Sequence, residues 1–149
     1  LKQLAEAYYE TGGNVVAVSE VPREHTNRYG ILETGRDDGR LVEVKGLVEK
    51  PKPEDAPSNL SIIGRYILTP DVMPHLAKLE KGAGGEVQLT DAMAKTIGHV
   101  PFHGLRYEGV RYDCGNKLGF LEAQIAFALE RPELAEGVRE FLKKYEGRN

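Results

Sequence analysis

The chain has 149 residues, of which 40% are hydrophobic and 29% are charged, a composition typical of one globular domain. Its formal net charge of −3 excludes the broad basic surface that a nucleic-acid partner requires. The single cysteine, Cys114, excludes an internal disulfide and is compatible with a reducing, cytoplasmic location. No apolar run approaches the ~20 residues of a membrane span, so no membrane partner is expected.

The first half of the chain predicts one helix followed by four strands. Apolar residues at helical spacing open the chain, and Gly12 ends that helix. β-branched runs favour strands, with a break at Pro22, a turn at Asp38-Gly39 and an interior glycine, Gly64. The helix is expected over residues 1–11, and the strands over 14–22, 29–35, 40–50 and 61–68, with a polar loop at 23–29.

The second half predicts helices separated by two short strands. Thr69 as N-cap and Pro70 at the first position favour a helix that runs to Gly82. A short helix follows, capped by Thr90 or by the residues just before it. This short helix is expected over 88–98, and it is followed by two strands within 100–115 and C-terminal helices over about 117–145, broken at Pro132.

These elements indicate an α/β fold in a single unit over residues 1–149. The first helix begins without a cap or a lead-in, which is what a fragment of a longer protein would show. The last helix carries an apolar stripe that suits a packing face or a contact between subunits.

Glu49 and Lys50 stand where an apolar strand is stopped by two prolines. Neighbouring strand side chains point to opposite faces, so each charge is expected to need a partner of its own. Ligands of α/β sheets bind beyond the strand ends, which makes the pair a candidate for binding a polar ligand. The alternative is a solvated strand end.

Asp113 in "RYDCGN" is the most suggestive acid, because its carboxylate follows an expected strand at a sharp turn where a metal or ligand can approach. The alternative is an Asx turn or a helix N-cap. Cys114 is either a packed small side chain or a nucleophile paired with a histidine. The histidine spacing does not match a zinc site.

The stretch "GAGGEVQLTD" contains glycines but lacks both the Lys-Ser/Thr ending of a phosphate-binding loop and a strand directly before it. We interpret it as a surface turn in which Glu86, Gln88 and Asp91 organise the next helix. The alternative is a segment that touches the substrate.

Taken together, "YGILE", "GLVEKPKPEDAPSNLSIIGRYILTP", "GAGGEVQLTDA" and "RYDCGNKLGFLEA" resemble the bacterial UTP:glucose-1-phosphate uridylyltransferases of the sugar nucleotidyltransferase family. Their order and spacing fit over nearly the whole chain. The resemblance implies a Rossmann-like, glycosyltransferase-A-like mixed sheet with flanking helices. It covers the C-terminal part of the family pattern only, because the "GxGTR"-like nucleotide loop and a further metal-binding aspartate are not in this sequence.

The resemblance also implies roles for individual residues. Glu49 is expected to hold sugar hydroxyls and Lys50 the sugar phosphate. The backbone of Gly30 is expected to touch the sugar, and Gly64 to let the sugar lie close to its strand.

Asp113 is expected to help bind the catalytic Mg²⁺, so that Lys50 and Asp113 are the expected catalytic residues. Tyr66 and Tyr112 are expected to line the sugar pocket.

The implied reaction of the intact protein joins glucose 1-phosphate to the α-phosphorus of UTP, giving UDP-glucose and pyrophosphate. The fragment alone is expected to be inactive, and at least a dimer is expected. One alternative is a thymidylyl- or cytidylyltransferase of the same fold. Another is a non-catalytic module for sugar-phosphate binding or oligomerisation.

Overall fold

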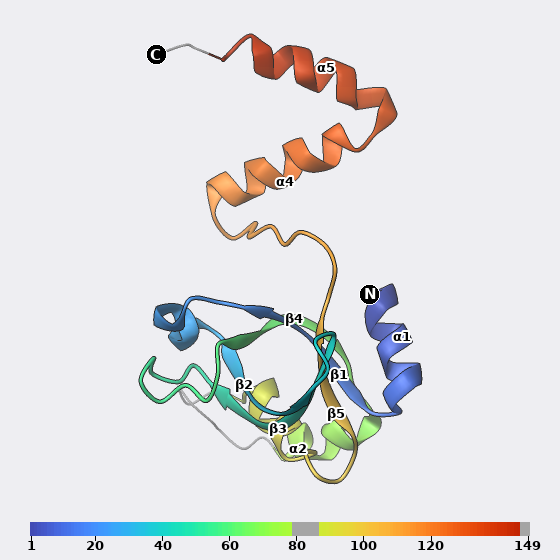
Figure 1. The fold of residues 1–149 in the computed structure, drawn as a ribbon, viewed down its shortest axis with the longest axis vertical. Helices are drawn as coiled ribbons and strands as arrows, with labels where there is room; N and C mark the ends of the chain where they lie inside the picture. Colours follow the sequence, from blue (N-terminus) through green and yellow to red (C-terminus); the bar gives the residue numbers. More distant parts are fainter. Residues whose placement is uncertain (79–86, 147–149) are drawn as a thin grey trace. The chain divides into compact units, whose positions relative to one another are not determined.

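A computed structural model describes residues 1–78 and 87–146 (Figure 1). Its contacts divide the chain into two compact units, Leu1–Glu108 and Gly109–Asn149. We describe each unit by itself, and the expectation of a single unit over residues 1–149 stays a prediction.

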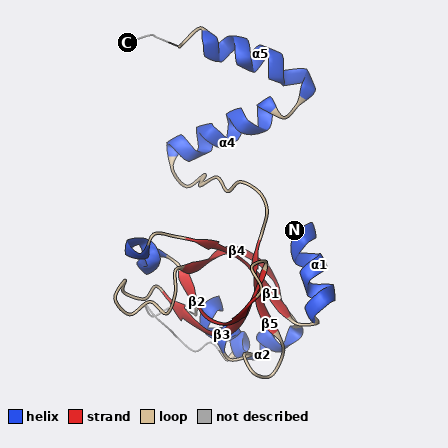
Figure 2. Cartoon of the chain, in the orientation of Figure 1, coloured by secondary structure: helices blue, strands red, loops and turns tan. Residues whose placement is uncertain are grey.

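The first unit is a five-stranded sheet with helices (Figure 2). Its elements are α1 (Lys2–Thr11), β1 (Asn14–Glu20), η1 (Arg23–Arg28), β2 (Gly30–Asp37), β3 (Leu41–Glu49), β4 (Leu60–Ile67), η2 (Pro70–Val72), α2 (Met73–Ala77), α3 (Leu89–Ala94) and β5 (Phe102–Arg106). The helix at the start of the chain and the first four strands are confirmed within a few residues of their predicted bounds.

The strands close on themselves in the order β1-β4-β2-β3-β5, with β5 returning to β1. The β1–β5 pair is parallel and the other pairs are antiparallel, so the sheet is mixed, which confirms the mixed sheet that the resemblance implied. The β2–β4 pairing is confined to Ile31 and Ser61. Through these pairings, the start of β2 lies beside the start of β4 and the end of β3.

Both faces of β1 are buried, which explains its unbroken apolar run. Val15 and Ala17 pack with Leu4 and Ala7 of α1. The alternate residues Val16 and Val18 face a second core that includes Met93 of α3. Strand alternation therefore presents one set of side chains to α1 and the other to α3.

Three expected segments, a loop, a helix and a strand, differ from the structure. The polar segment expected as a loop forms the 3₁₀ helix η1, and the helix expected from Thr69 is a 3₁₀ turn, η2, followed by the short α2. Its predicted end at Gly82 lies outside the described residues. The second expected strand, near Asp113, is wrong: residues 110–113 have no regular structure, because no described strand pairs with them.

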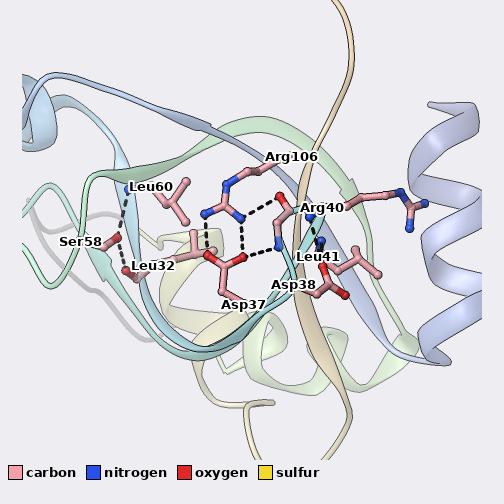
Figure 3. A network of polar contacts seen from close by, with 9 residues as sticks. Leu32, Asp37, Asp38, Arg40, Leu41, Ser58, Leu60 and Arg106 are labelled. Carbon is pink, nitrogen blue, oxygen red and sulfur yellow. Dashed lines mark hydrogen bonds and ion pairs between the residues drawn. The ribbon is translucent and has the colours of Figure 1, made fainter.

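The contact between β3 and β5 is reinforced by polar side chains at the β2–β3 turn (Figure 3). Arg106 on β5 donates to both carboxylate oxygens of Asp37, and it also donates to the carbonyl of Gly39. Asp38 accepts from the backbone N–H groups of Arg40 and Leu41. The turn predicted at Asp38-Gly39 is confirmed, with Gly39 at φ +90°.

The second unit contains the helices α4 (Lys117–Leu129) and α5 (Pro132–Lys143), which confirms the C-terminal helices. Asn116 is the N-cap of α4, and its side chain accepts from the backbone N–H of Gly119 over 2.7 Å. Pro132 begins α5, where its missing N–H costs no helical hydrogen bond. Within the described part of the chain, no helix has the length and apolar character needed to cross a membrane.

Candidate functional site

The end of β3 places Glu49 and Lys50 side by side. Lys50 is the one non-glycine residue in the described chain with a positive φ, +48°. Its backbone N–H donates to the carbonyl of Tyr29 over 3.0 Å, which holds the chain in this turn. A left-handed conformation costs a residue with a Cβ about 1 kcal/mol or more, and such strain is concentrated at functional sites.

The expectation that Glu49 and Lys50 point to opposite faces is wrong. Lys50 Nζ lies 3.7 Å from Oε1 of Glu49. The left-handed turn takes Lys50 out of the strand, so the alternation of strand side chains does not apply to it. The two side chains form an ion pair whose separation is longer than a hydrogen bond.

The Glu49 carboxylate lies against the first residue of β2. Glu49 pairs with Gly30 across the β2–β3 ladder, and its side chain is only 12% exposed. A Cβ on Gly30 would lie 3.1 Å from Oε2 of Glu49 and 3.3 Å from Oγ1 of Thr90. Glycine therefore gives the carboxylate room beside the backbone.

Thr90 is a member of this site that the sequence reasoning missed. Its hydroxyl donates to Oε2 of Glu49 over 2.7 Å. The N-cap of α3 is Gln88, one of the residues that the sequence allows just before Thr90, and Gln88 makes no side-chain capping bond. From sequence, a threonine near the start of a helix is expected to be an N-cap. Only the tertiary structure identifies Glu49 as the partner of its hydroxyl.

Gly64 and Tyr66 lie on β4 at a bulge. The β1–β4 register shifts between Val16 and Val18, and Gly64 has φ +67° there. A Cβ on Gly64 would lie 4.0 Å from the hydroxyl of Tyr66. Glycine is therefore required by the backbone conformation and not by close packing within the described chain.

The phenol of Tyr66 is half-buried, and burial raises its pKa, helped by the negative charge of Glu49 and opposed by Arg65. The Tyr66 hydroxyl therefore stays protonated at neutral pH and can donate a hydrogen bond. Tyr66 packs against the core cluster that contains Ile62, and Cδ1 of Ile62 lies 3.3 Å from the position a Cβ on Gly30 would take. We define the β3-end cluster as Gly30, Glu49, Lys50, Tyr66 and Thr90.

Asp113 lies in the second unit, in the turn before α4. Its Oδ1 accepts from the N–H of Gly115 over 3.0 Å, which is the Asx turn given as one alternative. The N-cap is Asn116 and not Asp113. A Cβ on Gly119 would lie 2.2 Å from the Asp113 carbonyl oxygen, so the turn packs directly on the first turn of α4.

The Asp113 carboxylate is exposed and can supply a hard oxygen ligand to Mg²⁺. Among the residues that the structure describes, no group of three or more acidic, histidine or cysteine side chains could hold a metal ion. Asp113 therefore fits as one protein ligand of a metal whose other ligands come from phosphates, water or another part of the protein.

Two neighbours of Asp113 also have defined environments. The ring of Tyr112 packs on Phe127 of α4 with centroids 5.8 Å apart. Cys114 is exposed, which contradicts the packed alternative for its side chain.

Of the turn residues expected to organise α3, Glu86 lies outside the described residues.

The fold and the sequence match one family. The model of the nucleotidyl transferase family matches residues 1–128. The chain belongs to this family. The expected membership of a nucleotidyltransferase family is thereby confirmed.

Curated relatives in the nucleotidyl transferase family include two that carry the name UTP–glucose-1-phosphate uridylyltransferase. The protein of Komagataeibacter xylinus is 77% identical over 116 residues, covering 78% of this chain and 41% of the relative. The protein of Staphylococcus haemolyticus is 46% identical over 144 residues, covering 97% of this chain and 50% of the relative. The chain thus spans about half the length of the curated relatives it matches.

Solved structures give the same result for the fold. A UDP-glucose pyrophosphorylase in complex with UDP-glucose superposes with a TM-score of 0.78 at 38% identity, covering 87% of this chain and 49% of that one. A UTP-bound enzyme from Acinetobacter baumannii superposes with a TM-score of 0.80 at 32% identity, covering 94% of this chain and 48% of that one.

Proposed function

We propose that the intact protein transfers a uridylyl group from UTP to glucose 1-phosphate, giving UDP-glucose and pyrophosphate, and that this chain supplies the sugar-phosphate half of the site. The observation that carries the proposal is the end of β3, where a part-buried carboxylate and a strained, exposed lysine lie side by side. The names of the two curated relatives support the same reaction.

Glu49 and Lys50 suit the two ends of one ligand. A carboxylate accepts hydrogen bonds from sugar hydroxyls, and an ammonium is a point charge suited to a phosphate. Lys50 is exposed and tethered at its backbone N–H, so its side chain can reach outward without disturbing the strand. The backbone of Gly30, beside the Glu49 carboxylate, is the proposed contact for the sugar.

The remaining expected contacts belong to the same proposal. Tyr66, kept protonated, donates a hydrogen bond on the sugar side of the β3-end cluster. The bulge at Gly64 leaves open space beside Tyr66 for the ligand. Tyr112 contributes a ring wall next to Asp113.

The chemistry needs charge neutralisation more than proton transfer. A phosphate oxygen of the sugar attacks the α-phosphorus of UTP in line, the bond to the leaving pyrophosphate breaks, and no covalent enzyme intermediate is required. Lys50 orients the attacking phosphate and offsets part of its charge. Asp113 is the residue of this chain that would hold Mg²⁺, which when bound neutralises phosphate charge.

Base specificity and assembly remain parts of the proposal. A thymidylyl- or cytidylyltransferase of the same fold is the nearest alternative, and the relatives' names favour the uridylyl reaction. We expect the chain alone to be inactive, because its sequence contains no nucleotide loop of the "GxGTR" type. We also propose a cytoplasmic protein and at least a dimer.

Calorimetric titration of the chain with glucose 1-phosphate, and separately with UTP, tests the proposal. We expect binding of the sugar phosphate and weak or no binding of UTP, because Glu49 and Lys50 belong to the sugar-phosphate half. Mg²⁺ is present in one series and omitted in the other. Binding of UTP without binding of glucose 1-phosphate would overturn the assignment.

A further inference from the structure

The part-buried carboxylate of Glu49 needs a fixed partner before any ligand arrives. Its side chain is 12% exposed, and a carboxylate removed from water is costly unless it is hydrogen-bonded. Lys50 Nζ, at 3.7 Å, is too distant for a hydrogen bond. The hydroxyl of Thr90, at 2.7 Å from Oε2, is within the range of a strong charge-assisted bond.

The Thr90 hydroxyl is itself held by the core. Thr90 is the second residue of α3, and Ala92 and Met93 of the same helix are buried in the hydrophobic core. A threonine side chain is branched at Cβ and has few χ1 rotamers. The position of its hydroxyl relative to β3 is therefore fixed by the packing of α3.

We infer that Thr90 is a positioning residue, which holds Oε2 of Glu49 so that Oε1 faces the sugar hydroxyls. This inference rests on the proposed function, because the sugar is the ligand that Oε1 would meet. A carboxylate free to rotate would present either oxygen, whereas the Thr90 bond fixes the plane of the group. Thr90 thereby makes the recognition of hydroxyls by Glu49 selective.

The test compares Thr90→Val with Thr90→Ser in the chain. Valine keeps the shape of threonine and removes the donor, whereas serine keeps the donor and removes a methyl group. Thr34→Val, at an exposed position of β2, is the matched control for the same change elsewhere. Each variant is titrated with glucose 1-phosphate and with its 2-deoxy and 3-deoxy analogues, and its thermal unfolding is recorded.

We expect Thr90→Val to bind glucose 1-phosphate about tenfold more weakly, since a hydrogen bond to a charged group is lost. Its preference for glucose 1-phosphate over the deoxy analogues should fall, because Glu49 no longer presents one oxygen. Thr90→Ser should stay within about twofold of the unchanged chain, and Thr34→Val should bind normally. If Thr90→Val does not fold, Thr90→Ala takes its place.

Four results overturn the inference. Equal binding by Thr90→Val and the unchanged chain would show that the hydroxyl is not needed. Equal weakening in Thr90→Ser and Thr90→Val, or an unchanged preference over the deoxy analogues, would show a packing role only. Failure of the unchanged chain to bind glucose 1-phosphate would overturn the proposed function, and with it this role. The other three results concern the role of Thr90 alone.

Discussion

Arg106 on β5 and Asp37 at the end of β2 form a two-pronged ion pair, with both hydrogen bonds 2.8 Å long. The planar guanidinium matches the carboxylate in the fork geometry that fixes orientation as well as charge. Asp37 ends the strand that runs from Gly30, so this pair ties the β2–β3 hairpin to β5 (Figure 3). The same β2–β3 hairpin therefore contains both the ion pair that closes the sheet and the Gly30–Glu49 pair of the β3-end cluster.

The Asp37 ion pair makes stability depend on pH. The hydrogen bond from Arg106, together with that from the Gly39 backbone, lowers the pKa of Asp37 from 3.8 to about 2. The folded state thus favours the ionised form, and its contribution is fully present above pH 3.8 and lost as the pH falls through about 2. Asp37→Asn should lower the thermal unfolding midpoint at pH 7, and the difference from the unchanged chain should shrink between pH 4 and pH 2.

Asp55→Asn, at an exposed position, is the control for loss of an aspartate charge at the surface. A constant difference between Asp37→Asn and the unchanged chain from pH 7 down to pH 2 would contradict this account. The contribution itself should be modest, because the pair is solvent-accessible.

Gly30→Ala should disturb the Glu49 carboxylate. The added Cβ would lie 3.1 Å from Oε2 of Glu49 and 3.3 Å from Cδ1 of Ile62. We expect a loss of about 1–3 kcal/mol in the free energy of unfolding, as for other overpacked sites. Glucose 1-phosphate should bind about tenfold more weakly, because even a small displacement of the Glu49 carboxylate misplaces its hydrogen bonds to the sugar. Urea unfolding and calorimetry measure the two effects.

Gly104→Ala separates these effects. Its Cβ would lie 2.8 Å from Cδ2 of Leu32, so it overpacks the core without touching the β3-end cluster. It should lower stability and leave the affinity of the folded chain for the sugar phosphate unchanged. Equal losses of affinity in both glycine variants would mean that Gly30 acts through stability alone.

Lys50 allows charge and backbone conformation to be separated. Lys50→Ala and Lys50→Gly both remove the ammonium and should both weaken binding of glucose 1-phosphate. Glycine adopts φ +48° readily, so Lys50→Gly should exceed Lys50→Ala in the free energy of unfolding by up to about 1 kcal/mol. Lys52→Ala, at a neighbouring exposed lysine, should bind normally in calorimetry. Unchanged affinity in both Lys50 variants would remove Lys50 from the site.

Two helix glycines of the second unit should respond in opposite ways. Gly119→Ala places a Cβ 2.2 Å from the Asp113 carbonyl oxygen and must displace the Asx turn or the start of α4. Gly137→Ala in α5 meets no atom within 4 Å and should stabilise that helix by roughly 0.5–1 kcal/mol. Amide hydrogen exchange should be faster in α4 for the first variant and slower in α5 for the second. An equal change in hydrogen exchange in the two variants would show that the turn at Asp113 moves aside without cost to α4.

Local chemistry made most of the elements predictable. The continuous apolar run of β1, the Asp38-Gly39 turn and the break at Pro132 each depend on residues next to one another in the chain. The strand expected near Asp113 was wrong, because a strand exists only through a partner that sequence does not name. The closure of the sheet through β5 was equally invisible for the same reason.

The sequence by itself determined the charged pair at the end of β3, since Pro51 and Pro53 stop the strand at Glu49 and Lys50. Only the tertiary structure decided what surrounds that pair. Thr90 lies 41 residues from Glu49, and their hydrogen bond depends on how α3 packs against the sheet. The left-handed turn at Lys50 likewise depends on the carbonyl of Tyr29 from the neighbouring segment. Side-chain type is a local property, whereas the orientation of a carboxylate is set by contacts that only folding brings together.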